Sequence, residues 1–332
     1  PAGTLPRPAC LKTRPLHQAP SQAPHVLGAT ACLDKSAAAP DIRAMITGPT
    51  SHSFMSQRLR LHYVDWGNEG APTLILLHGG RDHCRNWDWV AQALRDDWHI
   101  IAPDLRGHGD SAWSSDGEYS PRANVYDLAQ LIHQLNVGPV HIVAHSYGGN
   151  ISLRYAGVYP DMVKKLVAIE GLGPSPKLLA ERFAEAPDKR MRDWIEGKRA
   201  AAGRVPRKYP SLEDAYKRMK DENAYLSSEQ ARHLTIHGIS QNEDGTYSWK
   251  FDNYFRVMTP YDMPQAELEK LWANITCPTL LAYGEKSWAS NPAEDGRLAH
   301  FQNATVKLYK DAGHWLHHDK LDEFVADLKA FL

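Results

Sequence analysis

The sequence predicts an α/β fold with a mostly parallel central sheet flanked by helices. From residue 58 onward, short apolar runs alternate with amphipathic stretches. The runs are continuous, as expected for strands that are buried on both faces of a parallel sheet. They occupy residues 73–77, 99–103, 140–144, 166–169, 278–283 and 305–309, and an alternating stretch at 58–64 predicts a half-buried strand before them.

The stretches between these runs predict helices. Ser120 and Pro121 provide an N-cap and a first-turn proline for one helix. Apolar residues on one face from Leu321 to Phe331 predict a terminal helix that covers the last strand. Between residues 175 and 267 the alternation of strand and helix breaks. Helical patches there predict a mostly helical insertion, whose basic segment at 198–208 is expected to be solvated.

These patterns predict a core of residues 53–174 and 268–332, interrupted by the insertion at residues 175–267. Residues 1–52 are rich in Pro and Ala and have neither a helical nor a strand period. Such a composition buries too little apolar surface to offset the entropy of ordering, so we expect a disordered or poorly packed leader. Met45 would suit a natural start.

The composition argues against several classes of function. The 332 residues carry a net charge of −1, which disfavours nucleic-acid binding through a broad basic surface. No apolar run approaches the roughly 18 residues of a membrane helix, so we expect no membrane span and a soluble, cytoplasmic protein. The four cysteines form no CxxC pair, so we expect neither a disulfide scaffold nor a structural zinc site.

The segment 144–149 (AHSYGG) has the pattern of a nucleophile on a sharp turn. It follows an apolar strand and precedes a predicted helix, the context that such a turn requires. The small residues Gly148 and Gly149 allow the tight turn, which exposes the hydroxyl of Ser146. An oxyanion hole needs backbone N–H groups, and Tyr147, the residue after the nucleophile, supplies one. Gly80, after the strand at 73–77, is our first choice for the second.

With these motifs, the chain resembles an α/β-hydrolase over roughly residues 55–332. The matching pieces are residues 78–80 (HGG), 103–111 (PDLRGHGDS), 144–149 (AHSYGG) and 313–315 (GHW). By its place in the same loop as Gly80, Arg81 is the reserve for the second oxyanion donor. The resemblance implies that residues 103–111 are structural and that residues 175–267 form a helical cap over the pocket. Because this fold orders its triad as Ser, acid, His, it also implies that His314 is the base.

The acid of the triad departs from the family pattern. The usual position, three residues after Gly284, is Ser287, which cannot carry the required charge. We favour Glu170, which ends the strand at 166–169, where haloalkane dehalogenases place their acid. Glu285 and Asp295 are the alternatives.

Ser146 in place of an Asp nucleophile supports attack on an acyl carbon. We therefore expect a serine esterase that cleaves a small-molecule ester of small or medium acyl length through an acyl-enzyme, with no metal or organic cofactor. One alternative is a hydrolase of the same fold that cleaves a carbon–carbon bond in a diketone-like substrate. Another is a non-enzymatic ligand receptor on this fold.

Overall fold

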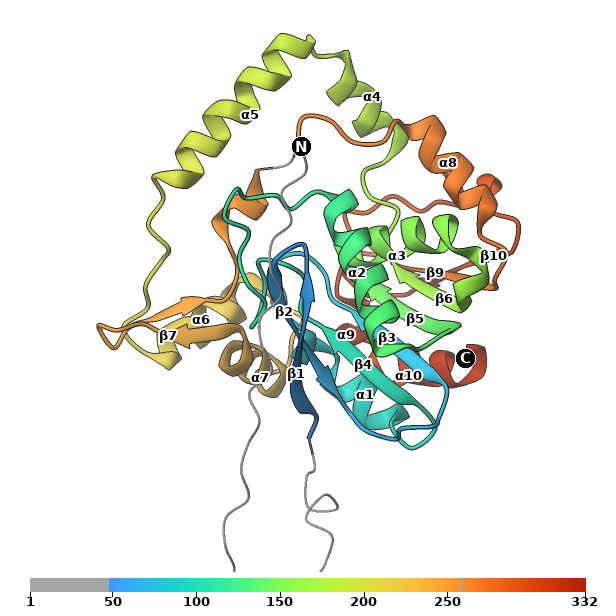
Figure 1. Cartoon of the computed structure of the whole chain (residues 1–332), viewed down its shortest axis with the longest axis horizontal. Helices are drawn as coiled ribbons and strands as arrows, with labels where there is room; N and C mark the ends of the chain where they lie inside the picture. Colours follow the sequence, from blue (N-terminus) through green and yellow to red (C-terminus); the bar gives the residue numbers. More distant parts are fainter. Residues whose placement is uncertain (1–47, 258) are drawn as a thin grey trace, which may run out of the picture. The chain divides into compact units, whose positions relative to one another are not determined.

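The structure is a computed structural model that describes residues 48–257 and 259–332. Eight strands form one sheet with the order β1-β2-β4-β3-β5-β6-β9-β10 (Figure 1). β2 pairs antiparallel with β1 and β4, and all the other neighbouring strands are parallel, which confirms the predicted fold class. The strands of this sheet are β1 (Thr50–Ser56), β2 (Leu59–Asp65), β3 (Thr73–Leu77), β4 (His99–Pro103), β5 (Val140–His145), β6 (Val163–Ile169), β9 (Thr279–Gly284) and β10 (Ala304–Tyr309).

The first strand extends beyond the core that the sequence predicts. The expected boundary at residue 53 falls inside β1, whose first four residues are exposed. Its buried residues are Phe54 and Ser56 only. A polar strand at the edge of a sheet has no apolar run, so the sequence pattern does not indicate where it begins.

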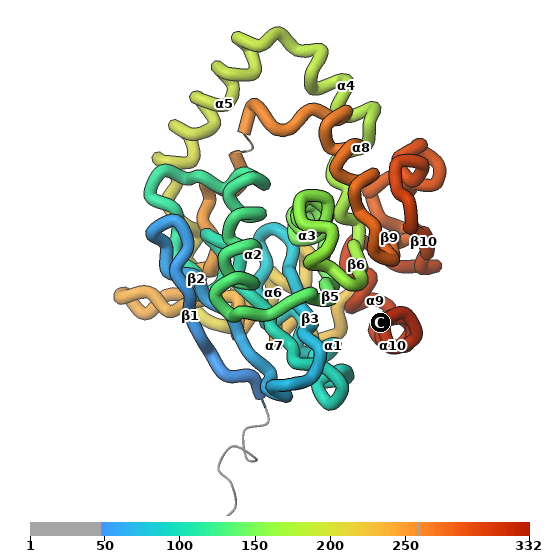
Figure 2. The backbone as a smooth tube through the Cα atoms, turned by 45° about the vertical axis from the view of Figure 1, so that its right-hand side comes forward, coloured from blue at the N-terminus to red at the C-terminus, as the bar shows by residue number. Residues whose placement is uncertain are grey.

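Helices cover both faces of the sheet (Figures 1 and 2). Alternate residues of β5 enter two separate cores, Ile142 in one and Val143 in the other. The first core includes α2 (Pro121–Leu135), α3 (Ser146–Val158) and α8 (Gln265–Asn274), and the second includes α1 (Asp88–Leu94), α9 (Leu316–Asp319) and α10 (Leu321–Phe331). Short 3-10 helices are η2 (Cys84–Trp87), η3 (Pro160–Met162), η4 (Asn253–Arg256) and η5 (Arg297–His300). The predicted boundary at residue 268 falls inside α8. This helix belongs to the core, since its residues Leu268 and Trp272 pack in the first core.

The segment between β6 and α8 contains α4 (Pro176–Ala184), α5 (Pro187–Ala202), α6 (Leu212–Glu222) and α7 (Ser228–Gly238). α4 and α5 bury none of their residues, and Figures 1 and 2 show them arching away from the sheet. A hairpin of β7 (Ile239–Gln241) and β8 (Tyr247–Trp249) follows α7, an element that the mostly helical prediction missed. The Asp-Gly pair before β8, with Gly245 at φ 80°, is the signal for that hairpin. No described helix has the length and hydropathy that a membrane span requires.

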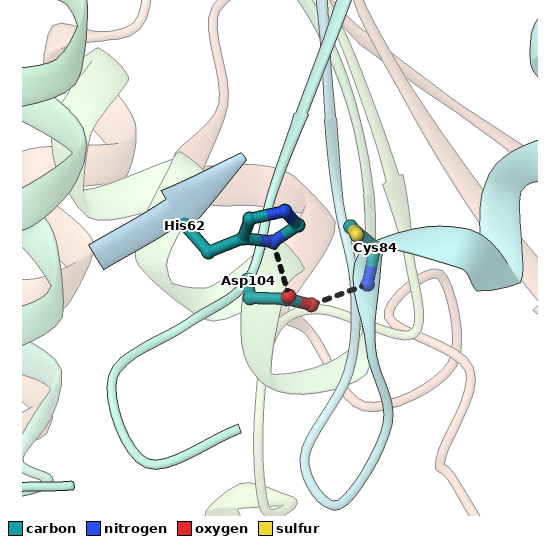
Figure 3. A group of neighbouring side chains, drawn as sticks. All are labelled: His62, Cys84 and Asp104. Carbon is teal, nitrogen blue, oxygen red and sulfur yellow. Dashed lines mark hydrogen bonds and ion pairs between the residues drawn. The ribbon is translucent and has the colours of Figure 1, made fainter. Parts of the chain in front are cut away.

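A buried carboxylate organises the loop after β4 (Figure 3). Asp104 accepts hydrogen bonds from His62 Nδ1 and from the backbone N–H of Cys84, both at 2.7 Å, and from the backbone N–H of Asp110 at 2.9 Å. Burial disfavours the ionised form of Asp104, but the hydrogen bonds from His62 and Asp110 and the nearby imidazoles of His62 and His78 together outweigh it and lower the pKa of the carboxyl. The contacts tie β2, η2 and residues 104–111 together, which is the structural role that the sequence predicts for Asp104.

A buried ion pair joins the same loop to α2. Arg106 donates from Nε and Nη2 to the two carboxylate oxygens of Asp127 at 2.6 and 2.7 Å. Ser56 donates to the same carboxylate at 2.5 Å. Because both charged side chains are withdrawn from water, the removal of one partner leaves the other unpaired in the interior.

Asp127→Ala is therefore expected to lower the free energy of unfolding by about 3–5 kcal/mol, measured by urea unfolding. The matched control is Asp193→Ala, which breaks an exposed pair with Lys189 and should cost less than about 1 kcal/mol. Similar losses in the two variants would mean that the buried Arg106 needs no anionic partner.

Candidate active site

Ser146 lies at the turn where β5 ends and α3 begins. Its φ of 51° places it in the left-handed region, which non-glycine residues rarely adopt. The turn packs closely on its neighbours: a Cβ atom at Gly148 would lie 2.4 Å from the carbonyl oxygen of His78, and one at Gly149 would lie 2.7 Å from Cα of Gly171. The two glycines are thus required by backbone contacts, and the turn has the strained geometry that the sequence predicts.

His314 follows β10 and faces the serine. Its Nε2 is 3.0 Å from Ser146 Oγ, within hydrogen-bond range. The backbone carbonyl of His314 accepts a hydrogen bond from His145 Nε2 at 2.9 Å. Burial lowers the pKa of His145 well below its ordinary value, so this imidazole stays neutral and holds the loop of His314 in place.

Glu170 completes a chain of three side chains. It directly follows β6, is buried, and has a φ of 48°. Its Oε2 forms a hydrogen bond with His314 Nδ1. Its other oxygen, Oε1, accepts from the backbone N–H of Gly284 at 2.9 Å. The structure thus brings Ser146, His314 and Glu170 together in one hydrogen-bonded series.

The alternative acids lie elsewhere. Glu285 is exposed and accepts a hydrogen bond from the backbone N–H of Asp311 at 3.1 Å, which is the first cause of its lowered pKa. Asp295 binds Arg297 through both carboxylate oxygens. The geometry therefore favours Glu170 over both as the partner of His314.

Ser287 is a contact that sequence reasoning missed. Its hydroxyl donates at 2.6 Å to Oε2 of Glu170, the same oxygen that His314 contacts. The available signal was its place three residues after Gly284, where the family usually has the acid. A serine there supplies no charge, but it fixes the carboxylate that does.

The candidate oxyanion donors lie beside the serine. Gly80 and Tyr147 line the same cavity as Ser146 and His314. The N–H of Tyr147 belongs to the first turn of α3, where backbone donors have no intrahelical acceptor. Within the described ranges, the N–H of Gly80 also has no hydrogen-bond acceptor. Arg81, the reserve donor, lines the cavity too, with a φ of 63°.

The cavity in front of Ser146 has a volume of about 1000 Å³. Aromatic side chains from several elements form much of its wall: Trp249, Phe251, Phe255, Trp288 and Trp315. Its size is at the upper end of the range for small-molecule sites, and its wall combines aromatic side chains with many polar and charged ones. The cavity therefore has room for an organic substrate at the serine.

Two groups of side chains in the described parts of the chain have metal-ligand types within reach of one another. In the first, Asp104 already binds His62, and burial raises the pKa of the Cys84 thiol well above its ordinary value, so that thiolate, the form that binds metals, is disfavoured. In the second, Arg85 binds the Asp88 carboxylate. Both carboxylates are thus engaged by protein groups, and the residues fit a structural role better than a metal site.

Comparison with known proteins concerns the fold of the chain and its relatives. A family described as alpha/beta hydrolase fold matches residues 72–321. Esterase Rv0045c of Mycobacterium tuberculosis is 29% identical over 210 residues, which are 63% of this chain and 66% of that protein, so the chain spans slightly less than two thirds of that relative. The sn-1-specific diacylglycerol lipase ABHD11 of Mus musculus is 25% identical over 275 residues, 80% of this chain and 82% of that protein.

Among solved structures, a thioesterase domain from the curacin biosynthetic pathway has a TM-score of 0.74 and 21% identity, over 85% of this chain and 100% of that one. At this identity the likeness concerns the fold alone.

Proposed function

Because the chain belongs to the α/β-hydrolase fold family, we propose that it is a serine hydrolase that cleaves carboxylic esters of small or medium acyl length. The observation that carries the proposal is the hydrogen-bonded series from Ser146 through His314 to Glu170. This arrangement gives a hydroxyl a base, and gives the base an anion that orients it.

In the first half of the proposed reaction, Ser146 Oγ attacks the carbonyl carbon of the ester and His314 Nε2 accepts the hydroxyl proton. The negative charge that develops on the carbonyl oxygen faces the N–H groups of Gly80 and Tyr147. His314 then returns the proton to the leaving alcohol, and the acyl group stays on Ser146. In the second half, His314 takes a proton from water, the resulting hydroxide equivalent attacks the acyl carbon, and Ser146 is released with its proton restored.

Glu170 keeps the histidine in the productive orientation. A carboxylate on Nδ1 selects the tautomer whose Nε2 accepts a proton, and it stabilises the imidazolium that forms. The hydrogen bonds from Gly284 and Ser287 hold this carboxylate without neutralising it.

The names of the relatives support ester cleavage. One is an esterase and another is a lipase, and both activities cleave carboxylic esters. The cavity at Ser146, walled by aromatic side chains, suits an acyl chain of small or medium length.

We expect a fluorophosphonate probe to label the protein on Ser146, detected by mass spectrometry of the labelled peptide. Ser146→Ala should abolish both labelling and the turnover of nitrophenyl esters, because the nucleophile is lost. Its thermal transition should stay close to that of the wild type, which separates loss of chemistry from loss of fold.

Persistent ester turnover in Ser146→Ala would refute the nucleophile. Turnover of a diketone without turnover of nitrophenyl esters would instead assign the site to carbon–carbon cleavage.

Glu170→Gln should lower kcat by at least about a hundredfold with a smaller change in KM, since the amide keeps the shape but not the charge. The matched control is Glu285→Gln, which changes the same chemical group on the exposed neighbouring loop and should cost less than about tenfold. Both variants are measured on one nitrophenyl ester. The reverse ranking would move the acid to Glu285, and two mild effects would mean that His314 needs neither carboxylate.

A further inference from the structure

The wall of the cavity at Ser146 has more positive than negative side chains. Its cations are Arg81, Arg207, Arg218, Arg256 and Lys286, and its acids are Glu222 and Asp319. The chain as a whole carries a net charge of −1, so this excess of cations is local.

Some of these charges are neutralised by neighbours. Arg218 forms an ion pair with Glu222. Lys286 lies 3.8 Å from the Glu285 carboxylate. In contrast, neither Arg81 nor Arg256 has an ion-pair partner among residues 48–257 and 259–332; Arg256 stacks over the ring of Phe251, 5.5 Å from its centroid.

The two unpaired arginines lie near each other. Partial burial lowers the pKa of Arg256. The positive charge of the neighbouring Arg81 lowers this pKa further, and Arg204 has a smaller effect in the same direction. Two guanidinium groups remain charged at neutral pH and repel each other unless an anion lies between them. Both arginines line the cavity of Ser146, and Glu222 offsets their positive charge only in part, so an anion between them would be favoured.

Packing of Phe255 joins the two backbone segments that carry the arginines. Phe255 in η4 packs on Gly80, so closely that a Cβ atom there would lie 2.6 Å from its ring. The same ring contacts His108 and Tyr147, with centroids 4.5 and 5.1 Å apart. Phe255 thus fixes η4 over the turn that contains Gly80 and Arg81, and Arg256 is the next residue along.

The backbone of Arg81 adds a second, independent observation. A left-handed conformation at an arginine is strained, and such strain persists where the surrounding structure enforces it, often at ligand sites. The turn is the one whose N–H groups face the oxyanion in the proposed reaction, and Arg81 lines the cavity in front of Ser146.

We infer that Arg81 and Arg256 form an anion subsite, and that the preferred substrate is an ester bearing a carboxylate or phosphate group. This inference rests on the proposed function, because it names the class of substrate at the same serine. Each planar guanidinium group can bind a carboxylate or a phosphate through two parallel N–H donors. Arg207, which also lines the cavity and has no ion-pair partner in the described parts of the chain, supplies further positive potential.

The test compares matched anionic and neutral esters by release of nitrophenolate. The first pair is the mono-nitrophenyl ester of adipic acid and its neutral terminal amide, which place the charge in the acyl half. The second pair is the butyrate ester of a carboxylated nitrophenol and its neutral amide, which place the charge in the leaving group. For at least one pair we expect kcat/KM to be at least about tenfold higher for the anion, with an advantage that shrinks at high salt.

The variant Arg81→Gln/Arg256→Gln should lower this anion-to-neutral ratio at least about tenfold, whereas Arg256→Lys should keep most of it. The matched control is Arg192→Gln/Arg199→Gln, which removes the same charge from exposed pairs on α5 and should leave the ratio unchanged. Because the readout is a ratio on one enzyme, a general loss from a disturbed turn cancels.

The failures of the two proposals are distinguishable. If neutral esters are cleaved in a Ser146-dependent manner and neither anion is preferred, the anion subsite is refuted and the esterase stands. If no ester is cleaved, the esterase fails, and calorimetric titration of the protein with adipate decides on the subsite. Binding that the double variant and high salt both weaken would support the subsite, and absence of binding would overturn it.

Discussion

The left-handed backbone of Ser146 is the constraint on which the rest of the site depends. A residue in this conformation costs of order 1–3 kcal/mol, so its neighbours must enforce it. They do so by close backbone contact, since Gly148 lies against the carbonyl of His78 and Gly149 against Gly171. β5, buried along its whole length, and the packed helix α3 hold the two ends of the turn. The hydroxyl is thereby exposed at the carboxyl edge of the sheet.

The same constraint positions the acid. β5 and β6 are adjacent and parallel, and His145 pairs with Ile169, so the residues that follow them, Ser146 and Glu170, leave the sheet side by side. Both have positive φ angles, and the contact between Gly149 and Gly171 locks one turn to the other. β9 is the next strand; its last residue, Gly284, donates its N–H to the carboxylate, and Ser287 in the loop after it donates its hydroxyl. Glu170, the proposed acid, therefore lies within reach of His314 although it follows β6 and not β9.

The parts of the site that the sequence could predict are those that directly follow an apolar run. Ser146 and Glu170 end continuous strands, and His314 closely follows the last one, so the convergence of parallel strands brings them together. The contact of Ser287 with Glu170 joins the loops that follow two different strands, and Phe255 packs on Gly80 from a segment far away in the chain. No local sequence pattern predicts either contact. The start of β1 was missed for another reason: its first four residues are exposed and polar, so they form no apolar run.

The physical difference among neighbouring histidines explains why only one of them suits the role of base. His145, His314 and His317 have rings within 4.7 Å of one another along the series. Burial lowers the pKa of His145 and of His317 well below the ordinary value, which makes their protonation costly. Nε2 of His145 donates a hydrogen bond to the backbone carbonyl of His314, and Nε2 of His317 lies 2.8 Å from Oδ1 of Asn86. His314 is partly exposed towards the cavity, and the Glu170 carboxylate contacts its Nδ1. Of the three rings, His314 is therefore the one beside Ser146 whose positive charge, when it forms, has a negative partner in place.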